Sequence, residues 1–379
     1  MDINITQADE EFRDECRSWL RANVPSDIAP LETERGFAEH REWDRLLFDA
    51  GWSVVTWPVE YGGRDASLMQ WLIFEEEYHL AGAGLRAAHN GISLLAPAIF
   101  VFGTDDQRSR YLRRMAAAED IWCQGWSEPD AGSDIASLRS RAVRDDAAGG
   151  WRLCGQKTWT TRGAFSTHIF TLFRSSADEP RHKGLTYFLV PLDAPGVTVR
   201  GFGRVGGEVG FAEVFFDDVL VPDSDVLGKV NGGWDVAMAT TSNERGLTLR
   251  SPAWFTAAAE RLVAAWRGNC DPRDTRIADE VARCWIDAEA YRWATYEVAQ
   301  EVASGTELGA RASMAKLFWS ELDFRLHEVG MEVTADQAHD ADAYWTRGYL
   351  TALSGPIWGG TNEIQRDVVA RRILGLPRS

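Results

Sequence analysis

Two segments near the middle of the chain contain the residue types that a planar, polar ligand requires. They are Gly125–Asp134 and Gly155–Thr161. Trp126 and Trp159 offer aromatic stacking area, and Gly132 allows the backbone to approach closely. The hydroxyl groups available at the ligand's edge are those of Ser127, Ser133 and Thr161. The alternative is a pair of polar turns with two core tryptophans, since the chain has 17 Trp.

These segments resemble the signatures of a known family. Ser127–Asp134 resembles the Thr/Ser-Glu-Pro-x-Ala-Gly-Ser-Asp loop of the acyl-CoA dehydrogenase flavoenzymes. Gly155–Thr161 resembles the Gly-Gln-Lys-x-Trp-x-Thr strand that follows this loop. Further matches lie in residues 51–63 and 360–366, in family order. The resemblance therefore covers essentially the whole chain and implies FAD as the cofactor.

The family's reaction also depends on one carboxylate. The resemblance implies oxidation of an acyl-CoA, or of an acyl-carrier thioester, to the trans-2-enoyl thioester. A glutamate takes the α-proton and flavin N5 takes the β-hydride. In the common pattern this glutamate precedes Gly-Thr near the C-terminus, where this chain has Gly359. Members similar to isovaleryl-CoA and long-chain acyl-CoA dehydrogenases carry it on an earlier helix beside an arginine. Aligning residues 233–238 with that helix makes Glu244 the predicted catalytic base.

Other site residues follow from the resemblance position by position. The residues expected to bind FAD are Gln124, Trp126, Ser127, Ser133, Trp159, Thr161, Thr361 and Glu363. Those expected to bind the substrate are Ser133, Ser242, Arg245 and Gly360. A purely structural role is the alternative for each of them, and it is strongest for Trp126 and Arg245.

Two cofactor-binding motifs of the homotetrameric members are missing. An Arg-x-x-Phe-Gly turn is replaced by residues 267–273, and a Gln-x-x-Gly-Gly-x-Gly turn by residues 334–340. Arg273 or Arg276 is an open candidate for a substitute phosphate ligand. The departure is similar to actinobacterial members, some of which act on bulky sterol or polyketide-type acyl groups and some of which pair two different chains.

Three functions therefore stay open. The first is an FAD-dependent acyl-CoA dehydrogenase, working as a homodimer, a homotetramer or a heterotetramer with a related chain. Its electron acceptor would be an electron-transferring flavoprotein or a similar protein. The second is a partner subunit that completes another chain's FAD site. The third is an oxidase on the same fold.

Composition excludes several other classes. The net charge of −17 argues against nucleic acid or an anionic membrane as a partner. The N-terminus lacks a signal-peptide pattern, and the 5 cysteines include no Cys-x-x-Cys, so we expect a cytoplasmic protein with reduced thiols. No histidine pair has metal-ligand spacing, so no metal site is expected.

The order of periodic segments predicts an α+β fold in three parts. A helical domain over residues 1–119 precedes a β domain over 120–229, expected as a small barrel or sandwich, and a four-helix bundle over 230–379. Capping boxes begin helices at Thr6 and Thr104. One helix is expected over residues 234–267, and the last one over 361–372.

One glycine pattern in the β domain needs separate treatment. Residues 201–206 fit the Gly-x-Gly-x-x-Gly pattern of dinucleotide-binding folds. That fingerprint requires a helix immediately afterwards, whereas Val214–Phe216 reads as a strand. A glycine-rich loop is therefore the preferred interpretation.

Overall fold

The computed structural model describes residues 5–179, 181–245, 251–271, 273–306 and 309–377, with only the backbone of residues 242–245. The chain forms two compact units. The helical unit comprises Met1–Pro25, Ala66–Ala83 and Arg245–Ser379, and the sheet unit comprises Ser26–Asp65 and Gly84–Glu244. These units group distant segments of the chain, so the predicted domain boundaries at residues 119 and 229 stay predictions.

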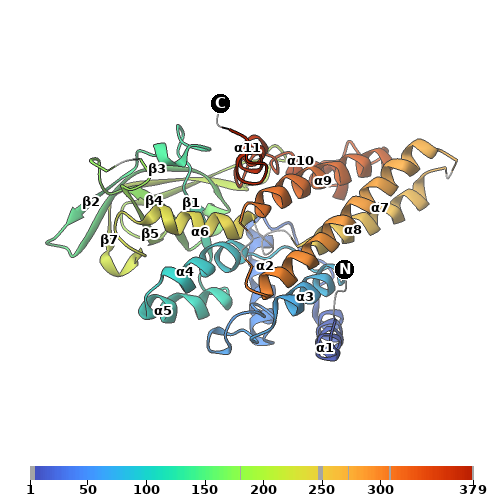
Figure 1. The fold of residues 1–379 in the computed structure, drawn as a ribbon, viewed down its shortest axis with the longest axis horizontal. Coiled ribbons are helices and arrows are strands. Elements are labelled where there is room, and N and C mark those ends of the chain that lie inside the picture. Colours follow the sequence, from blue (N-terminus) through green and yellow to red (C-terminus); the bar gives the residue numbers. More distant parts are fainter. Residues whose placement is uncertain (1–4, 180, 246–250, 272, 307–308, 378–379) are drawn as a thin grey trace. The chain divides into compact units, whose positions relative to one another are not determined.

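The sheet unit is built on one mixed, 8-stranded sheet (Figure 1). Its strands are β1 (Trp122–Gly125), β2 (Arg141–Asp145), β3 (Gly150–Thr161), β4 (His168–Arg174), β5 (Leu185–Pro191), β6 (Val197–Phe202), β7 (Phe211–Pro222) and β8 (Val226–Leu227). The order is β6-β7-β3-β2-β4-β5-β8, with β1 parallel to β4. The predicted glycine-rich loop is confirmed from Gly203 on, because residues 203–210 join β6 directly to β7, whereas Gly201 and Phe202 end strand β6.

Apolar residues that alternate along the strands form the core of this unit. The fully buried members include Leu153, Phe173, Phe188, Val190 and Val214. The unit's α-helices are α2 (Glu34–Asp49), α4 (Ala96–Phe102), α5 (Asp105–Ala116) and α6 (Gly233–Arg245, whose last residue falls in the helical unit). A π-helix over Gly91–Leu95 leads directly into α4.

The helical unit contains the remaining α-helices. They are α1 (Gln7–Asn23), α3 (Leu68–Leu80), α7 (Pro252–Asn269), α8 (Thr275–Ala303), α9 (Arg311–Val333), α10 (Tyr344–Ala352) and α11 (Asn362–Arg372). Helices α7, α8 and α9 pack around a core that includes Phe255, Leu262 and Leu326 (Figure 1). The single helix predicted over residues 234–267 is wrong, because α6 ends at Arg245 and α7 begins at Pro252. Pro252 occupies the first helical position, where its missing N–H costs nothing.

A buried ion-pair cluster joins α1, α3 and α8 within the helical unit. The side chains of Glu76 and Glu77 are buried, and Glu77 accepts hydrogen bonds from Arg13 and Arg17. Arg292 of α8 donates to Glu76 at 2.7 Å. The acidic run at residues 75–77 is therefore an ion-paired helix face and not a site for a ligand.

Candidate functional site

A buried ion pair connects the two signature segments inside the sheet unit. The Lys157 ammonium lies 2.8 Å from Glu128 Oε1, with side-chain exposures of 0% and 8%. The carboxylate also accepts the backbone N–H groups of Arg139 at 2.6 Å and Ser140 at 3.0 Å. Glu128 lies in the loop after β1, Lys157 lies in the middle of β3, and the two backbone donors lie just before β2. The ion pair and its backbone bonds therefore hold these three segments together.

Backbone contacts strengthen this connection. The Thr158 N–H donates to the Ser127 carbonyl at 2.9 Å, and Lys157 Nζ donates to the Trp126 carbonyl at 3.4 Å. Within the loop, the Glu128 and Ala131 backbones bond to each other in both directions. The first signature segment is therefore held against the second one by main-chain and side-chain bonds together.

Burial and pairing both act on the pKa values of this pair. Burial opposes the charge on Glu128, but the Lys157 ammonium and the Arg139 N–H outweigh burial and lower the pKa of the carboxyl. Burial lowers the pKa of Lys157 to about 8, against the raising effect of Glu128. Both groups are therefore charged at neutral pH.

The lowered pKa of Glu128 predicts a loss of stability in acid. A carboxyl whose pKa is lower in the folded chain stabilises it fully above the ordinary value of 4.5, and this contribution disappears as the pH falls through the folded value. The free energy of unfolding of the wild type, measured in urea, is therefore expected to fall as the pH drops below about 4.5. In Glu128→Gln, the free energy of unfolding should depend less steeply on pH in this range. Equal slopes in the variant and the wild type would show that the pKa of Glu128 is not lowered by folding.

Trp159 occupies a strained and exposed position in the second signature segment. The pairing register of β3 with β7 shifts between Lys157 and Thr160, and Trp159 within this step has φ of 57°. Its side chain is 59% exposed, although Phe202 and Phe211 contact it edge-on at centroid distances of 5.4 and 5.5 Å. Bulges re-aim side chains, and strained non-glycine residues concentrate at functional sites. The bulge therefore presents an indole for a ligand to stack on.

The residues present fit an isoalloxazine ring. Beside the exposed Trp159 indole, the Ser127 and Thr161 side chains are partly buried and supply hydroxyls. The Trp126 Nε1 and Thr160 Oγ1 atoms are buried without a hydrogen-bond partner among the described residues. A flat ring with hydrogen-bonding edges matches the exposed indole and the two partly buried hydroxyls, whereas the Trp126 and Thr160 atoms lie inside the sheet unit.

Trp126 itself lies deeper than Trp159. Only 7% of it is exposed, and its ring packs edge-on against Phe170 and Tyr187. Gln124 lies half-buried on β1, and Ser133 is exposed on the loop. The sheet unit thus places six predicted cofactor residues on β1, β3 and the loop after β1, with Trp126 furthest into the core.

Three predicted residues lie where side chains are not described. The backbone places Ser242, Glu244 and Arg245 in the last turn of α6. Their side chains lie outside the described residues, so the helical setting is confirmed and their roles stay predictions.

The predicted C-terminal site residues lie in the helical unit, at the start of α11. Gly359 and Gly360 have φ of 65° and 83°, and the buried Gln365 amide donates to both of their carbonyls at 3.1 and 3.2 Å. Thr361 caps α11 by accepting the Ile364 N–H. The Glu363 carboxyl has a lowered pKa because it accepts its own backbone N–H and the Thr361 hydroxyl. Gly360, Thr361 and Glu363 therefore all lie in the single hydrogen-bonded turn that leads into α11.

Both candidate phosphate ligands are already engaged within the helical unit. Arg273 pairs with Asp271 at 2.6 Å, and Arg276 pairs with Glu332. All four side chains are at least 45% exposed. The two arginines thus make ordinary surface ion pairs, which contribute little energy.

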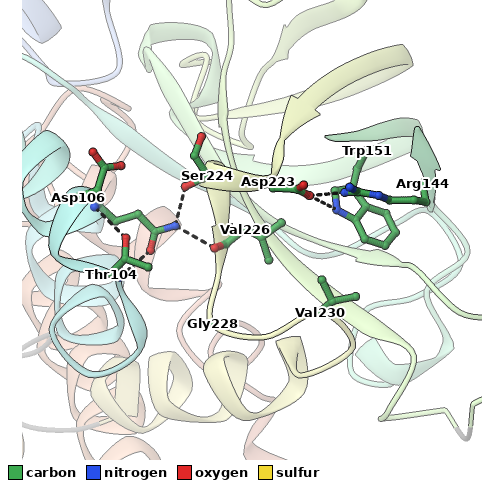
Figure 2. Close-up of a pocket in the computed structure, with 10 residues that line it drawn as sticks. Thr104, Asp106, Arg144, Trp151, Asp223, Ser224, Val226, Gly228 and Val230 are labelled. Carbon is green, nitrogen blue, oxygen red and sulfur yellow. Dashed lines mark hydrogen bonds and ion pairs between the residues drawn. The ribbon is translucent and has the colours of Figure 1, made fainter. Parts of the chain in front are cut away.

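The described part of the sheet unit contains cavities beside the signature segments and elsewhere. One of about 320 Å³ adjoins both signature segments, and its walls include Glu128, Ala131, Gly155 and Gln156. Another of about 780 Å³ lies between the start of α5 and the end of β7 (Figure 2). In the second one the Asp223 carboxylate already accepts bonds from Arg144 and the Trp151 indole, so its polar wall is satisfied internally.

Within the described ranges, no group of three or more His, Cys, Asp or Glu residues is placed to hold a metal ion. No helix in the part of the chain that the structure describes has the length and apolar character needed to cross a membrane. The cysteines at positions 16, 123, 154, 270 and 284 are all free thiols.

Some residues at this site were missed by sequence reasoning. Glu128 and Lys157 belong to the two signatures, and their opposite charges were an available signal for a pair. Phe202 and Phe211, which support Trp159, gave no comparable signal because only the strand pairing brings them together.

Comparisons with known proteins agree with this geometry. Models of the acyl-CoA dehydrogenase N-terminal, middle and C-terminal domains match residues 6–119, 123–219 and 231–374. The chain is 38% identical to "Acyl-CoA dehydrogenase IpdE1" of Mycobacterium tuberculosis, over 97% of this chain and 98% of the relative. Among solved structures, a "Tcur3481-Tcur3483 steroid ACAD" is similar with a TM-score of 0.88 and 27% identity over the whole of both chains. The "ChsE4-ChsE5 complex from Mycobacterium tuberculosis" is similar with a TM-score of 0.82 and 30% identity, also over both whole chains.

Proposed function

The chain belongs to the acyl-CoA dehydrogenase family, whose members are FAD-dependent oxidoreductases acting on CH–CH bonds, and we propose that it converts an acyl-CoA to its trans-2-enoyl thioester. In this proposal Glu244 removes the α-proton. FAD supplies the two-electron acceptor that receives the β-hydride. The observation that carries the proposal is the strained, exposed Trp159 held beside the Ser127 loop.

The chain's own residues have separate tasks in this reaction. The Trp159 indole, with the Ser127 and Thr161 hydroxyls, would hold the isoalloxazine in place. Ser242, Arg245, Ser133 and Gly360 would line the substrate. A dry setting would suit this role of Glu244, because burial disfavours a charged carboxylate and makes it a stronger base.

The proposed acyl group is bulky and polycyclic. Support comes from the similarity to the solved steroid acyl-CoA dehydrogenase across both whole chains. A steroid-type acyl-CoA should therefore be oxidised with a higher kcat/KM than a straight-chain acyl-CoA of similar carbon number.

We further propose that a related second chain completes the FAD site. The two missing motifs in this chain are the ones that bind the adenosine diphosphate in homotetrameric members. The candidate substitutes Arg273 and Arg276 are engaged in surface ion pairs. Two of the similar solved structures are named as complexes of two different proteins.

The visible spectrum of the purified protein tests both proposals. Produced alone, the chain should retain little flavin, and produced with a related acyl-CoA dehydrogenase chain it should be yellow. Adding a steroid-type acyl-CoA without oxygen should then bleach the flavin absorbance, and the enoyl product should be detectable by mass spectrometry. A yellow complex that no acyl-CoA bleaches would contradict the dehydrogenase, and hydrogen peroxide formed in air at the rate of turnover would instead indicate an oxidase.

A further inference from the structure

We infer that the buried Glu128–Lys157 ion pair is a positioning device for the Trp159 indole, and through it for the flavin. The inference rests on the proposed flavin-facing role of Trp159. Neither charged group is itself placed against the ring: both side chains are buried within the sheet unit, whereas Trp159 is exposed.

The pair has one defined arrangement. Glu128 Oε1 accepts from Lys157 Nζ and the Ser140 N–H, while Oε2 accepts from the Arg139 N–H. The Lys157 ammonium also donates to the Trp126 carbonyl and lies 4.8 Å from the Phe173 ring centroid. A charge-assisted network with this many fixed partners restricts both side chains to a narrow range of positions.

Lys157 stands immediately before the bulge. It is the last β3 residue in register with β7, opposite Val214, and pairing resumes at Thr160 opposite Ala212. Between these points the backbone turns left-handed at Trp159, a conformation that is unfavourable for a non-glycine residue. Such a conformation persists only where its neighbours determine it. The ion pair and strand pairing of Lys157 on one side, and the strand pairing of Thr160 on the other, hold the backbone of Trp159 in this conformation.

Stability alone does not explain this choice of residues. Replacing a buried ion pair with apolar residues of similar volume is often neutral or even stabilising. An apolar pair at positions 128 and 157 would fill the space, but it would lose the directed bonds to Ser140, Arg139 and Trp126. Compared with an apolar pair, the ion pair therefore adds directional hydrogen bonds. These bonds fix the orientation of the backbone that leads to Trp159.

The test uses two variants and one control. Glu128→Gln/Lys157→Met removes both charges together, so neither is left buried alone. Glu128→Asp keeps the charge but shortens its reach. Arg152→Met removes an ion pair with Asp218 that joins the same strands β3 and β7 at the surface. Each is made with 5-fluorotryptophan, and the ¹⁹F signal of Trp159 is assigned by its absence in Trp159→Phe.

The double variant should unfold at a temperature close to that of the wild type, yet its Trp159 signal should shift or split while the Trp43 signal stays in place. FAD affinity, measured on the chain together with any partner it requires, should fall by about tenfold or more, since small misplacements at a site have large effects. Glu128→Asp should also shift or split the Trp159 signal and lower the FAD affinity. Arg152→Met should leave both the Trp159 signal and the FAD affinity unchanged.

The outcomes separate the inference from the proposed function. An unchanged Trp159 signal in Glu128→Asp and in the double variant would overturn the inference. If the double variant does not fold, Glu128→Asp alone decides. If the signal moves but Trp159→Phe and the wild type bind FAD equally well, the positioning stands and the flavin-facing role of Trp159 fails.

Discussion

Replacing Glu244 with glutamine is expected to lower the rate of acyl-thioester dehydrogenation by about 10²-fold or more, while FAD stays bound. Glutamine preserves the shape of the side chain but cannot accept the α-proton. The measurement is anaerobic flavin bleaching in a stopped-flow instrument, with the visible spectrum as the check on cofactor content. A suitable control is Glu260→Gln, because Glu260 is an exposed carboxylate on α7, the next helix along the chain.

A second readout identifies the step that is lost. Exchange of the substrate α-proton with deuterium from solvent requires the base but not hydride transfer. In Glu244→Gln this exchange should stop along with dehydrogenation. Normal turnover in the variant would assign the proton transfer to another residue, and loss of the flavin would indicate a structural role for Glu244.

Replacing Gly155 with alanine is expected to destabilise the sheet unit by about 3 kcal/mol, through both steric overlap and backbone strain. A Cβ at this position would lie 2.1 Å from Ser140 Oγ and 2.8 Å from Ser140 Cα. Gly155 also has φ of 151°, which side chains rarely adopt. Because Ser140 donates to Glu128, displacing it should weaken FAD binding as well. Urea unfolding of the flavin-free protein and FAD titration measure the two effects.

Gly149→Ala is the matched control. Gly149 also has positive φ, at 65°, but a Cβ there meets nothing within 4 Å. Its expected cost is therefore only the backbone strain, about 1–2 kcal/mol. If both alanine variants lose the same stability, the contact between Gly155 and Ser140 is not the cause.

Features decided by neighbouring residues were predictable from the sequence. The capping boxes predicted at Thr6 and Thr104 are present, because the bonds join residues three positions apart. The α+β fold was also predictable, since periodicity and family signatures agree along the chain. Helix α10 was missed, because the residue before its first turn, Ala343, has no side chain that can cap it.

Features decided by distant residues were not predictable. The exposure of Trp159 depends on a register shift between β3 and β7, which no local pattern records. The Glu128–Lys157 bond spans 29 positions, and charge alone does not distinguish buried partners from surface residues. The break between α6 and α7 had a local signal in Ser251-Pro252, but helical periodicity on both sides outweighed it.

The paired glycines before α11 bear on how the family could have diversified. At Gly359 the backbone is left-handed, and Gln365 holds the carbonyls of both glycines. A single codon change to glutamate at this position would place the new side chain on a backbone that disfavours it by about 1–2 kcal/mol. In this backbone, a glutamate at position 359 would therefore need a compensating change in the turn before α11.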